Sequence, residues 1–271
     1  MDQRKIYLQD VKFAQLKKWV KNILPESLKE VIEKRKQIPP YVFVGKLFTE
    51  NQYPWSSPNI WNELTSFYDV IKGPIIFEYG TGISSVWHYK NLQKKGSGDY
   101  IGVEFDENWF WGVVGALTKS AAIYSSDISI VTKRFLNSSN IDVTIKQGKC
   151  TVTLKLRPDA SDYAQAINTE CDIVIVDGAV RKMCLDYLLS TQFIRHNGLL
   201  MLMEAGRGHP DWWQGKLFGD DDYSEQVEKL IQLGGCFLDG NGLDSWSKCK
   251  RKSPKPTAYY YPMEAMKTII K

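Results

Sequence analysis

Residues 75–85 read Ile75-Ile76-Phe77-Glu78-Tyr79-Gly80-Thr81-Gly82-Ile83-Ser84-Ser85. A short, nearly continuous apolar run ends in two glycines, and a helical pattern begins at about Ser84. Such a run bounded by turn residues is typical of a buried strand. Glycines in the following turn tolerate positive φ and let the backbone approach a ligand beside the free N–H groups of a helix N-terminus. The stretch predicts the first strand, turn and helix of a Rossmann-like α/β domain.

Similar apolar runs recur downstream and are separated by helical patterns, which is typical of a parallel sheet with helices on both faces. Residues 142–156 alternate around Gln147-Gly148 like a hairpin, which we interpret as an insertion. The expected strands are 75–79, 100–104, 128–131, 172–176 and 199–203, with edge strands at 236–238 and 258–261 and helices at 59–70 and 224–233. The predicted fold class is therefore α/β, with a Rossmann-like sheet.

Two domains or segments are expected along the chain. Apolar residues at helical spacing between 11 and 36 predict two short amphipathic helices, so residues 1–52 are interpreted as an N-terminal helical extension. Residues 53–271 then form the Rossmann-like domain.

The composition predicts a soluble protein of the cytoplasm. The 271 residues are 43% hydrophobic and carry a formal charge of +4, and no apolar run approaches the roughly 20 residues that span a bilayer. The five cysteines are scattered, without the close pairs of a zinc site or disulfide framework. Positive residues gather in 17–36 and 248–255, mainly as solvated surface. These positive segments could also make weak contact with a membrane surface. Formation of a homo-oligomer is a further possibility.

Glu104 ends the second expected strand about 22 residues after Gly82, where a carboxylate can accept hydrogen bonds from a ribose. Together with the glycine turn it predicts an adenosine-type ligand. A dinucleotide motif would have glycine in place of Ser85, and the Glu78 carboxylate would repel a diphosphate. Glu78 suits a cationic ligand instead.

At this point the chain resembles class I S-adenosylmethionine-dependent methyltransferases, whose first motif is an acidic residue followed by Gly-x-Gly. The resemblance extends to a bacterial subgroup with three ordered motifs. The matching segments are Glu78 to Ser85, Val103-Glu104-Phe105-Asp106-Glu107-Asn108-Trp109, and Asp177-Gly178-Ala179-Val180-Arg181.

The resemblance implies S-adenosylmethionine as cofactor, with S-adenosylhomocysteine as product. It implies that Glu104 holds the ribose, that Phe105 flanks the adenine and that Asp162 or Tyr163 meets the base edge. The implied cofactor-binding residues are Ser57, Glu78, Gly80, Thr81, Gly82, Ser84, Glu104, Phe105, Asp162, Tyr163 and Asp177.

Asp177 and His209 are the candidate catalytic residues. Asp177 closes the fourth main strand at the sheet edge where open α/β sheets bind ligands. His209 lies in a Trp-rich segment, 206–222, that we expect to cover the acceptor. Only Asp177 and Glu204 supply carboxylates at these strand ends, fewer oxygen ligands than a divalent cation needs, so no metal is expected.

The predicted activity is methyl transfer from S-adenosylmethionine to a small-molecule or sugar acceptor, at a hydroxyl in preference to an amine. A nucleic-acid-binding or nucleic-acid-modifying protein that uses its basic termini is one alternative, although no nucleic-acid partner is expected. A nicotinamide-dependent oxidoreductase is the other.

Overall fold

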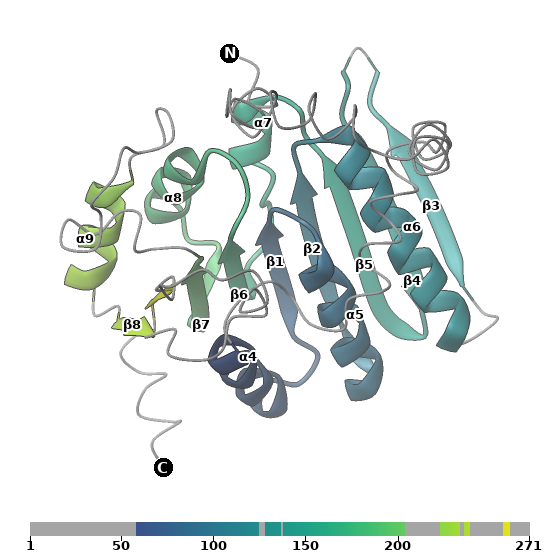
Figure 1. Cartoon of the computed structure of the whole chain (residues 1–271), viewed down its shortest axis with the longest axis horizontal. Helices are drawn as coiled ribbons and strands as arrows, with labels where there is room; N and C mark the ends of the chain where they lie inside the picture. The colour runs from purple at the N-terminus through teal and green to yellow at the C-terminus, as the bar shows by residue number, and fades with distance from the viewer. Residues whose placement is uncertain are drawn as a thin grey trace, which may run out of the picture.

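In the computed structural model, the described residues form a nine-stranded sheet at the centre of the molecule, with helices on both sides (Figure 1). The structure describes residues 58–124, 128–136, 138–203, 223–233, 236–238 and 257–260. The strands are β1 (Ile75–Tyr79), β2 (Ser97–Glu104), β3 (Ser129–Arg134), β4 (Ile141–Gln147), β5 (Lys149–Leu156), β6 (Cys171–Val176), β7 (Ile194–Leu202), β8 (Cys236–Leu238) and β9 (Thr257–Tyr260). The helices are α4 (Pro58–Val70), α5 (Ile83–Lys95), α6 (Glu107–Tyr124), α7 (Ala160–Ala164), α8 (Arg181–Ser190) and α9 (Ser224–Gln232).

The strand order is β3-β4-β5-β2-β1-β6-β7-β9-β8. In this order, the consecutive strands β5, β2, β1, β6 and β7 pair in parallel with one another. In contrast, β9 pairs antiparallel with both β7 and β8. From β1 the chain passes to β2 on one side, and β6 lies on the other side. The carboxyl ends of β1 and β6 therefore mark the topological switch point, where open α/β sheets bind ligands.

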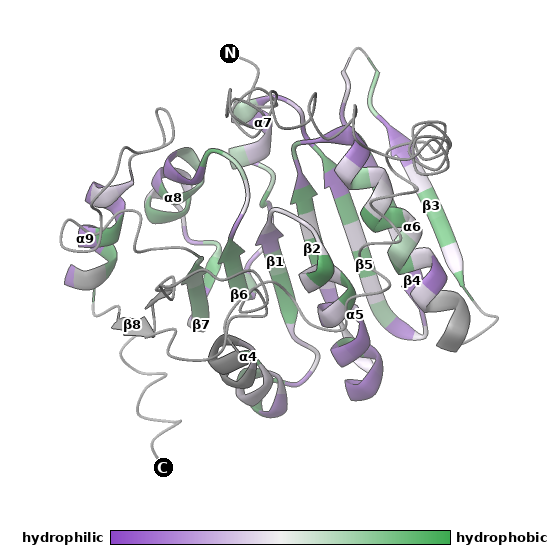
Figure 2. Cartoon of the chain, viewed as in Figure 1, coloured by the Kyte–Doolittle hydropathy of each residue, from purple (hydrophilic) through white to green (hydrophobic). Residues whose placement is uncertain are grey.

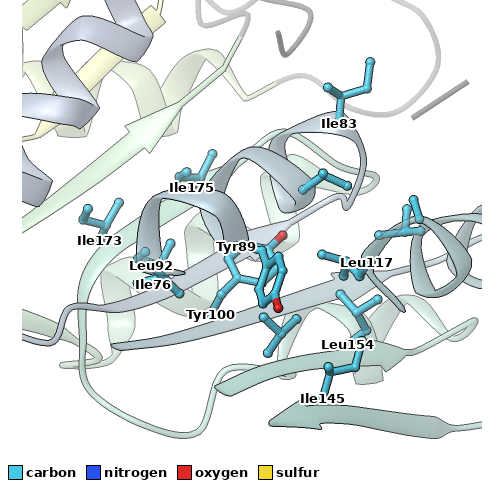
Figure 3. Close-up of a cluster of buried hydrophobic side chains, with 14 of the residues drawn as sticks. Ile76, Ile83, Tyr89, Leu92, Tyr100, Leu117, Ile145, Leu154, Ile173 and Ile175 are labelled. Atoms are coloured by element: carbon cyan, nitrogen blue, oxygen red, sulfur yellow. The ribbon is translucent and has the colours of Figure 1, made fainter. Parts of the chain in front are cut away.

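Each face of the sheet has its own hydrophobic core. Side chains of α4, α5 and α6 pack with those of β1, β2, β4 and β5 on one face, and α8 and α9 pack on the other. In Figure 3, Leu92 and Tyr89 of α5 lie near Ile76 and Tyr100 of the sheet, and Ile83 lies at the start of the same helix. The inner strands are strongly hydrophobic, while α5 has a hydrophilic end (Figure 2). Burial on both faces explains why these strands read as apolar runs.

The predicted α/β fold with helices on both faces is confirmed, and the 142–156 hairpin is present. Gly148 turns it with φ 59°, a conformation that favours glycine. The structure adds that β5, the second strand of the hairpin, lies within the sheet and pairs in parallel with β2. Strands β4 and β3 then extend that side of the sheet in antiparallel fashion.

The predicted extension, residues 1–52, lies outside the described residues, so its helices and the proposed domain boundary stay predictions. None of the helices that the structure describes is long and apolar enough to cross a membrane.

Candidate functional site

The turns after β1 and β6 meet at the switch point. Gly80 has φ 89°, and a Cβ on it would lie 2.5 Å from the Cα of Gly178. A Cβ on Gly178 would lie 1.8 Å from the hydroxyl of Tyr163. Real Cβ atoms do not make contacts this short, so both positions need glycine. The two motifs, almost 100 residues apart in the sequence, are in direct backbone contact.

Glu104 joins the glycine turn to the turn after β2. Its Oε1 accepts hydrogen bonds from the backbone N–H groups of Phe105 at 2.8 Å and Asp106 at 3.0 Å. Its Oε2 accepts from the N–H of Thr81 at 3.1 Å and from the Thr81 hydroxyl at 3.0 Å. Burial raises the pKa of Glu104 to about 7, and these hydrogen bonds oppose the shift. Glu104, which the sequence predicts to bind a ribose, therefore already accepts four hydrogen bonds from its own chain.

Thr81 is fixed by further contacts. Its carbonyl accepts a hydrogen bond from the indole Nε1 of Trp109 at 2.6 Å. A Cβ on Gly102 would lie 2.6 Å from the Thr81 methyl carbon Cγ2, so this methyl rests directly on the backbone of β2. These contacts direct the hydroxyl toward Glu104.

Glu78 lies at the end of β1 and is almost fully buried. The Tyr100 hydroxyl donates a hydrogen bond to it, and Ser84 hydrogen-bonds the same carboxyl. Burial raises the pKa of Glu78 to about 8, and the negative charges of Asp177 and Glu104 contribute in the same direction. The carboxyl is therefore largely protonated at neutral pH in the free protein.

A buried polar cluster continues from Glu78 into the core. The Ser85 hydroxyl pairs with the Tyr100 hydroxyl at 2.8 Å and accepts a hydrogen bond from the N–H of Gly82 at 3.0 Å. Ser85, at the position of the third glycine of a dinucleotide motif, thus fixes the start of α5. The ring of His88 stacks on Tyr100.

His88 of α5 is completely buried. Its Nδ1 hydrogen-bonds the Tyr68 hydroxyl at 2.6 Å, and burial lowers its pKa to about 3. A neutral, fully buried imidazole between two tyrosines has a packing role.

Asp177 directly follows β6, and its N–H donates to the Tyr79 carbonyl at 2.9 Å. Arg181 donates to the Asp177 carboxylate at 3.1 Å and to its carbonyl at 2.8 Å. The Asp177 side chain is 43% exposed, whereas that of Arg181 is 10% exposed. The buried Arg181 therefore fixes Asp177 from the protein side, while part of the Asp177 carboxylate stays open to solvent.

The residues expected around the adenine take different positions. Phe105 is half-buried and packs edge-on against Tyr163, with ring centroids 5.9 Å apart. Tyr163 is fully buried. Asp162 is exposed on α7 and accepts a hydrogen bond from Asn140 at 2.7 Å. Of the two base-edge candidates, the structure thus places Tyr163 beneath the Gly178 turn and Asp162 at the surface.

Ser57, Glu204 and His209 lie outside the described residues, as does the predicted acceptor-covering segment 206–222. The roles assigned to them stay predictions. Among the described residues, no group of three or more His, Cys, Asp or Glu side chains is arranged to hold a metal ion.

Two site residues were given no role by the sequence argument. Tyr100 hydrogen-bonds Glu78, and Trp109 fixes the Thr81 carbonyl. For Trp109, the spacing Asp106-x-x-Trp109 is a sequence pattern that could have indicated its place at the start of α6. Asp106 accepts a hydrogen bond from the Trp109 N–H at 2.9 Å and so caps the helix. No sequence pattern indicates the Tyr100 contact, because it depends on the pairing of β1 with β2.

No family model and no curated protein matches the chain. Solved structures with a similar arrangement include the SAH-bound methyltransferase PaMTH1 of Podospora anserina, with 15% identity and a TM-score of 0.44 over 88% of this chain and 97% of that one. Another is the O-methyltransferase TomG of Streptomyces achromogenes, involved in tomaymycin synthesis and solved in complex with SAM. It has 14% identity and a TM-score of 0.48 over 96% of this chain and 97% of that one.

Proposed function

We propose that this chain is an S-adenosylmethionine-dependent methyltransferase that modifies a small-molecule or sugar acceptor, at a hydroxyl in preference to an amine. The observation that carries the proposal is the meeting of the Gly80 turn, Glu104 and Asp177 at the switch point of the sheet. These are the three segments on which the resemblance to class I methyltransferases rests.

A nucleoside fits the residues at this edge. Glu104 offers a carboxylate at the end of β2, beside the turn over which a nucleoside would lie. Phe105, next to it, presents a half-buried aromatic ring for an adenine. In this proposal Gly80 and Gly82 provide close backbone approach, and the residue types present suit the nucleoside part of the cofactor.

Although Glu78 is largely protonated in the free chain, the site favours a cationic ligand over a diphosphate, because a cation would promote the ionisation of Glu78 and a diphosphate would oppose it. Glu78 and Glu104 are buried at the turn, and Asp177 acts electrostatically on Glu78. Arg181, the cation paired with Asp177, is held against that carboxylate. A sulfonium or ammonium group would be attracted here, and it would also favour the ionised form of Glu78.

The sheet itself also argues against a nicotinamide enzyme. A dinucleotide-binding sheet has the order 3-2-1-4-5-6 in mostly parallel strands. Here the strand beside β7 is the antiparallel β9. Ser85 in place of the third motif glycine points the same way.

When bound, the cofactor supplies an electrophilic methyl group on a sulfonium. The chain's contribution is to hold the acceptor in line with that group at about 3 to 3.5 Å, which accounts for most of the rate enhancement in such a displacement. Asp177, partly open to solvent and oriented by Arg181, can bind an acceptor hydroxyl or a cofactor ammonium. His209 is the second candidate for receiving the acceptor proton.

Calorimetric titration of the full chain with S-adenosylhomocysteine tests the proposal, and a separate titration with NAD⁺ provides the comparison. We expect dissociation constants in the micromolar range for the first ligand and no binding of the second. Absence of binding at millimolar S-adenosylhomocysteine by the folded chain would contradict the proposal, and binding of NAD⁺ would support the oxidoreductase instead. Salt-sensitive binding of nucleic acid would support the other alternative.

The acceptor is then sought by incubating the chain with S-adenosylmethionine and a panel of sugars, phenols and amines. Mass spectrometry of the products detects the added methyl group. Transfer to amines alone would refute the preference for hydroxyl acceptors.

A further inference from the structure

In the free chain, donors of the chain itself occupy both carboxylate oxygens of Glu104. A carboxylate offers about four lone-pair positions. Phe105 and Asp106 fill those of Oε1, and the two donors of Thr81 fill those of Oε2. Glu104 and Thr81 are also buried. A ribose hydroxyl therefore has to displace one of these donors to reach the carboxylate.

The four donors are not equally replaceable. Those of Phe105 and Asp106 are backbone N–H groups in the turn that leads into α6, and the Thr81 N–H belongs to the glycine turn itself. The Thr81 hydroxyl is the only one of the four on a side chain. Rotation about its Cα–Cβ bond, which also moves the methyl group away from Gly102, releases the hydroxyl without movement of the backbone.

Thr81 is held where its hydroxyl occupies Oε2. The Trp109 indole fixes the Thr81 carbonyl, and the Thr81 methyl packs on the Cα of Gly102. The hydroxyl chemically resembles the ribose hydroxyl that Glu104 would bind: each is a neutral O–H donor to the same carboxylate.

We propose that Thr81 is an affinity-determining residue whose hydroxyl competes with the ribose of the nucleoside for Glu104. The inference rests on the proposed function, because it takes the ligand to be a nucleoside. The free chain keeps Glu104 satisfied through Thr81, and binding exchanges this intramolecular hydrogen bond for one to the ribose. The exchange lowers the net gain from the ribose and makes the ligand displace the side chain before it can bind.

The variant Thr81→Val tests the competition, because valine keeps the methyl that packs on Gly102 and replaces the hydroxyl by a methyl group that cannot donate a hydrogen bond to Glu104. We expect it to bind S-adenosylhomocysteine about tenfold more tightly than the unmodified chain, the lower end of the effect of a hydrogen bond to a charged group. Thr81→Ser keeps the hydroxyl and should bind like the unmodified chain. The free Thr81→Val protein should melt at a lower temperature, because Glu104 has lost a donor.

An S-adenosylhomocysteine analogue without the two ribose hydroxyls separates competition from a general change of structure. Thr81→Val should not bind this analogue more tightly than the unmodified chain does, because the analogue has no hydroxyl to present to Glu104. Equal tightening for both ligands, or no tightening for S-adenosylhomocysteine, would overturn the inference while the proposed function stands. Failure of both proteins to bind S-adenosylhomocysteine would overturn the proposed function and the inference with it.

Discussion

The buried carboxyl of Glu78 should make the stability of the free protein fall as pH rises. Its pKa is about 8 in the folded chain, against 4.5 for an ordinary glutamate. Below pH 4.5 both the folded and the unfolded chain carry the proton, and the stabilisation is fully present. Between these two values the unfolded chain releases the proton and the folded chain retains it. The free energy of unfolding then falls by about 1.4 kcal/mol per pH unit.

From pH 5 to pH 8 this amounts to about 3 to 4 kcal/mol from Glu78. Glu104, with a pKa raised to about 7, adds a loss of the same sign that ends nearer pH 7. Glu78→Gln keeps the size of the side chain and an acceptor for Tyr100 but does not titrate in this range. The variant should lose the Glu78 contribution and keep that of Glu104.

Urea unfolding followed by tryptophan fluorescence at pH 5, 6, 7 and 8 measures these slopes. The exposed Glu170 provides the control, because Glu170→Gln should leave the slope of the unmodified chain unchanged. Parallel pH dependences for Glu78→Gln and the unmodified chain would refute the reasoning, since the proton would then not reside on Glu78.

Three further predictions concern the site. Glu104→Ala should weaken S-adenosylhomocysteine binding by about 1.5 to 3 kcal/mol in calorimetry, the scale of hydrogen bonds to a charged group, and unchanged affinity would show that the ribose binds elsewhere. Gly178→Ala should lower the melting temperature and abolish binding, because the added Cβ meets the Tyr163 hydroxyl and the Gly80 backbone; a variant with unmodified stability and affinity would contradict this close approach. His209→Gln should slow methyl transfer more than tenfold while binding is retained, and an unchanged rate would exclude that histidine as the base.

The sequence alone determined the inner sheet and the edge of the sheet at which the candidate ligand-binding residues lie. Strands β1 and β6 are buried on both faces, as is the carboxyl end of β2, so their apolar runs and the turns that follow them could be read directly. The glycine turn, Glu104 and Asp177 were assigned to one edge for the same reason, because parallel strands in βαβ units end on the same side.

The tertiary structure decided strand bounds and hydrogen-bond partners that a local sequence pattern cannot indicate. β7 begins at Ile194, earlier than its apolar run, because Ile194 pairs with Cys171 of β6, and the neighbouring Arg195 forms an ion pair with Asp172 of that strand. β3 extends to Arg134 although its side chains are exposed, because its backbone pairs with β4. Likewise, only the meeting of Thr81 with Glu104, and of Tyr100 with Glu78, shows that both carboxyls are already hydrogen-bonded within the chain. Such contacts join neighbouring strands and turns, and sequence spacing does not specify which donors reach a given oxygen.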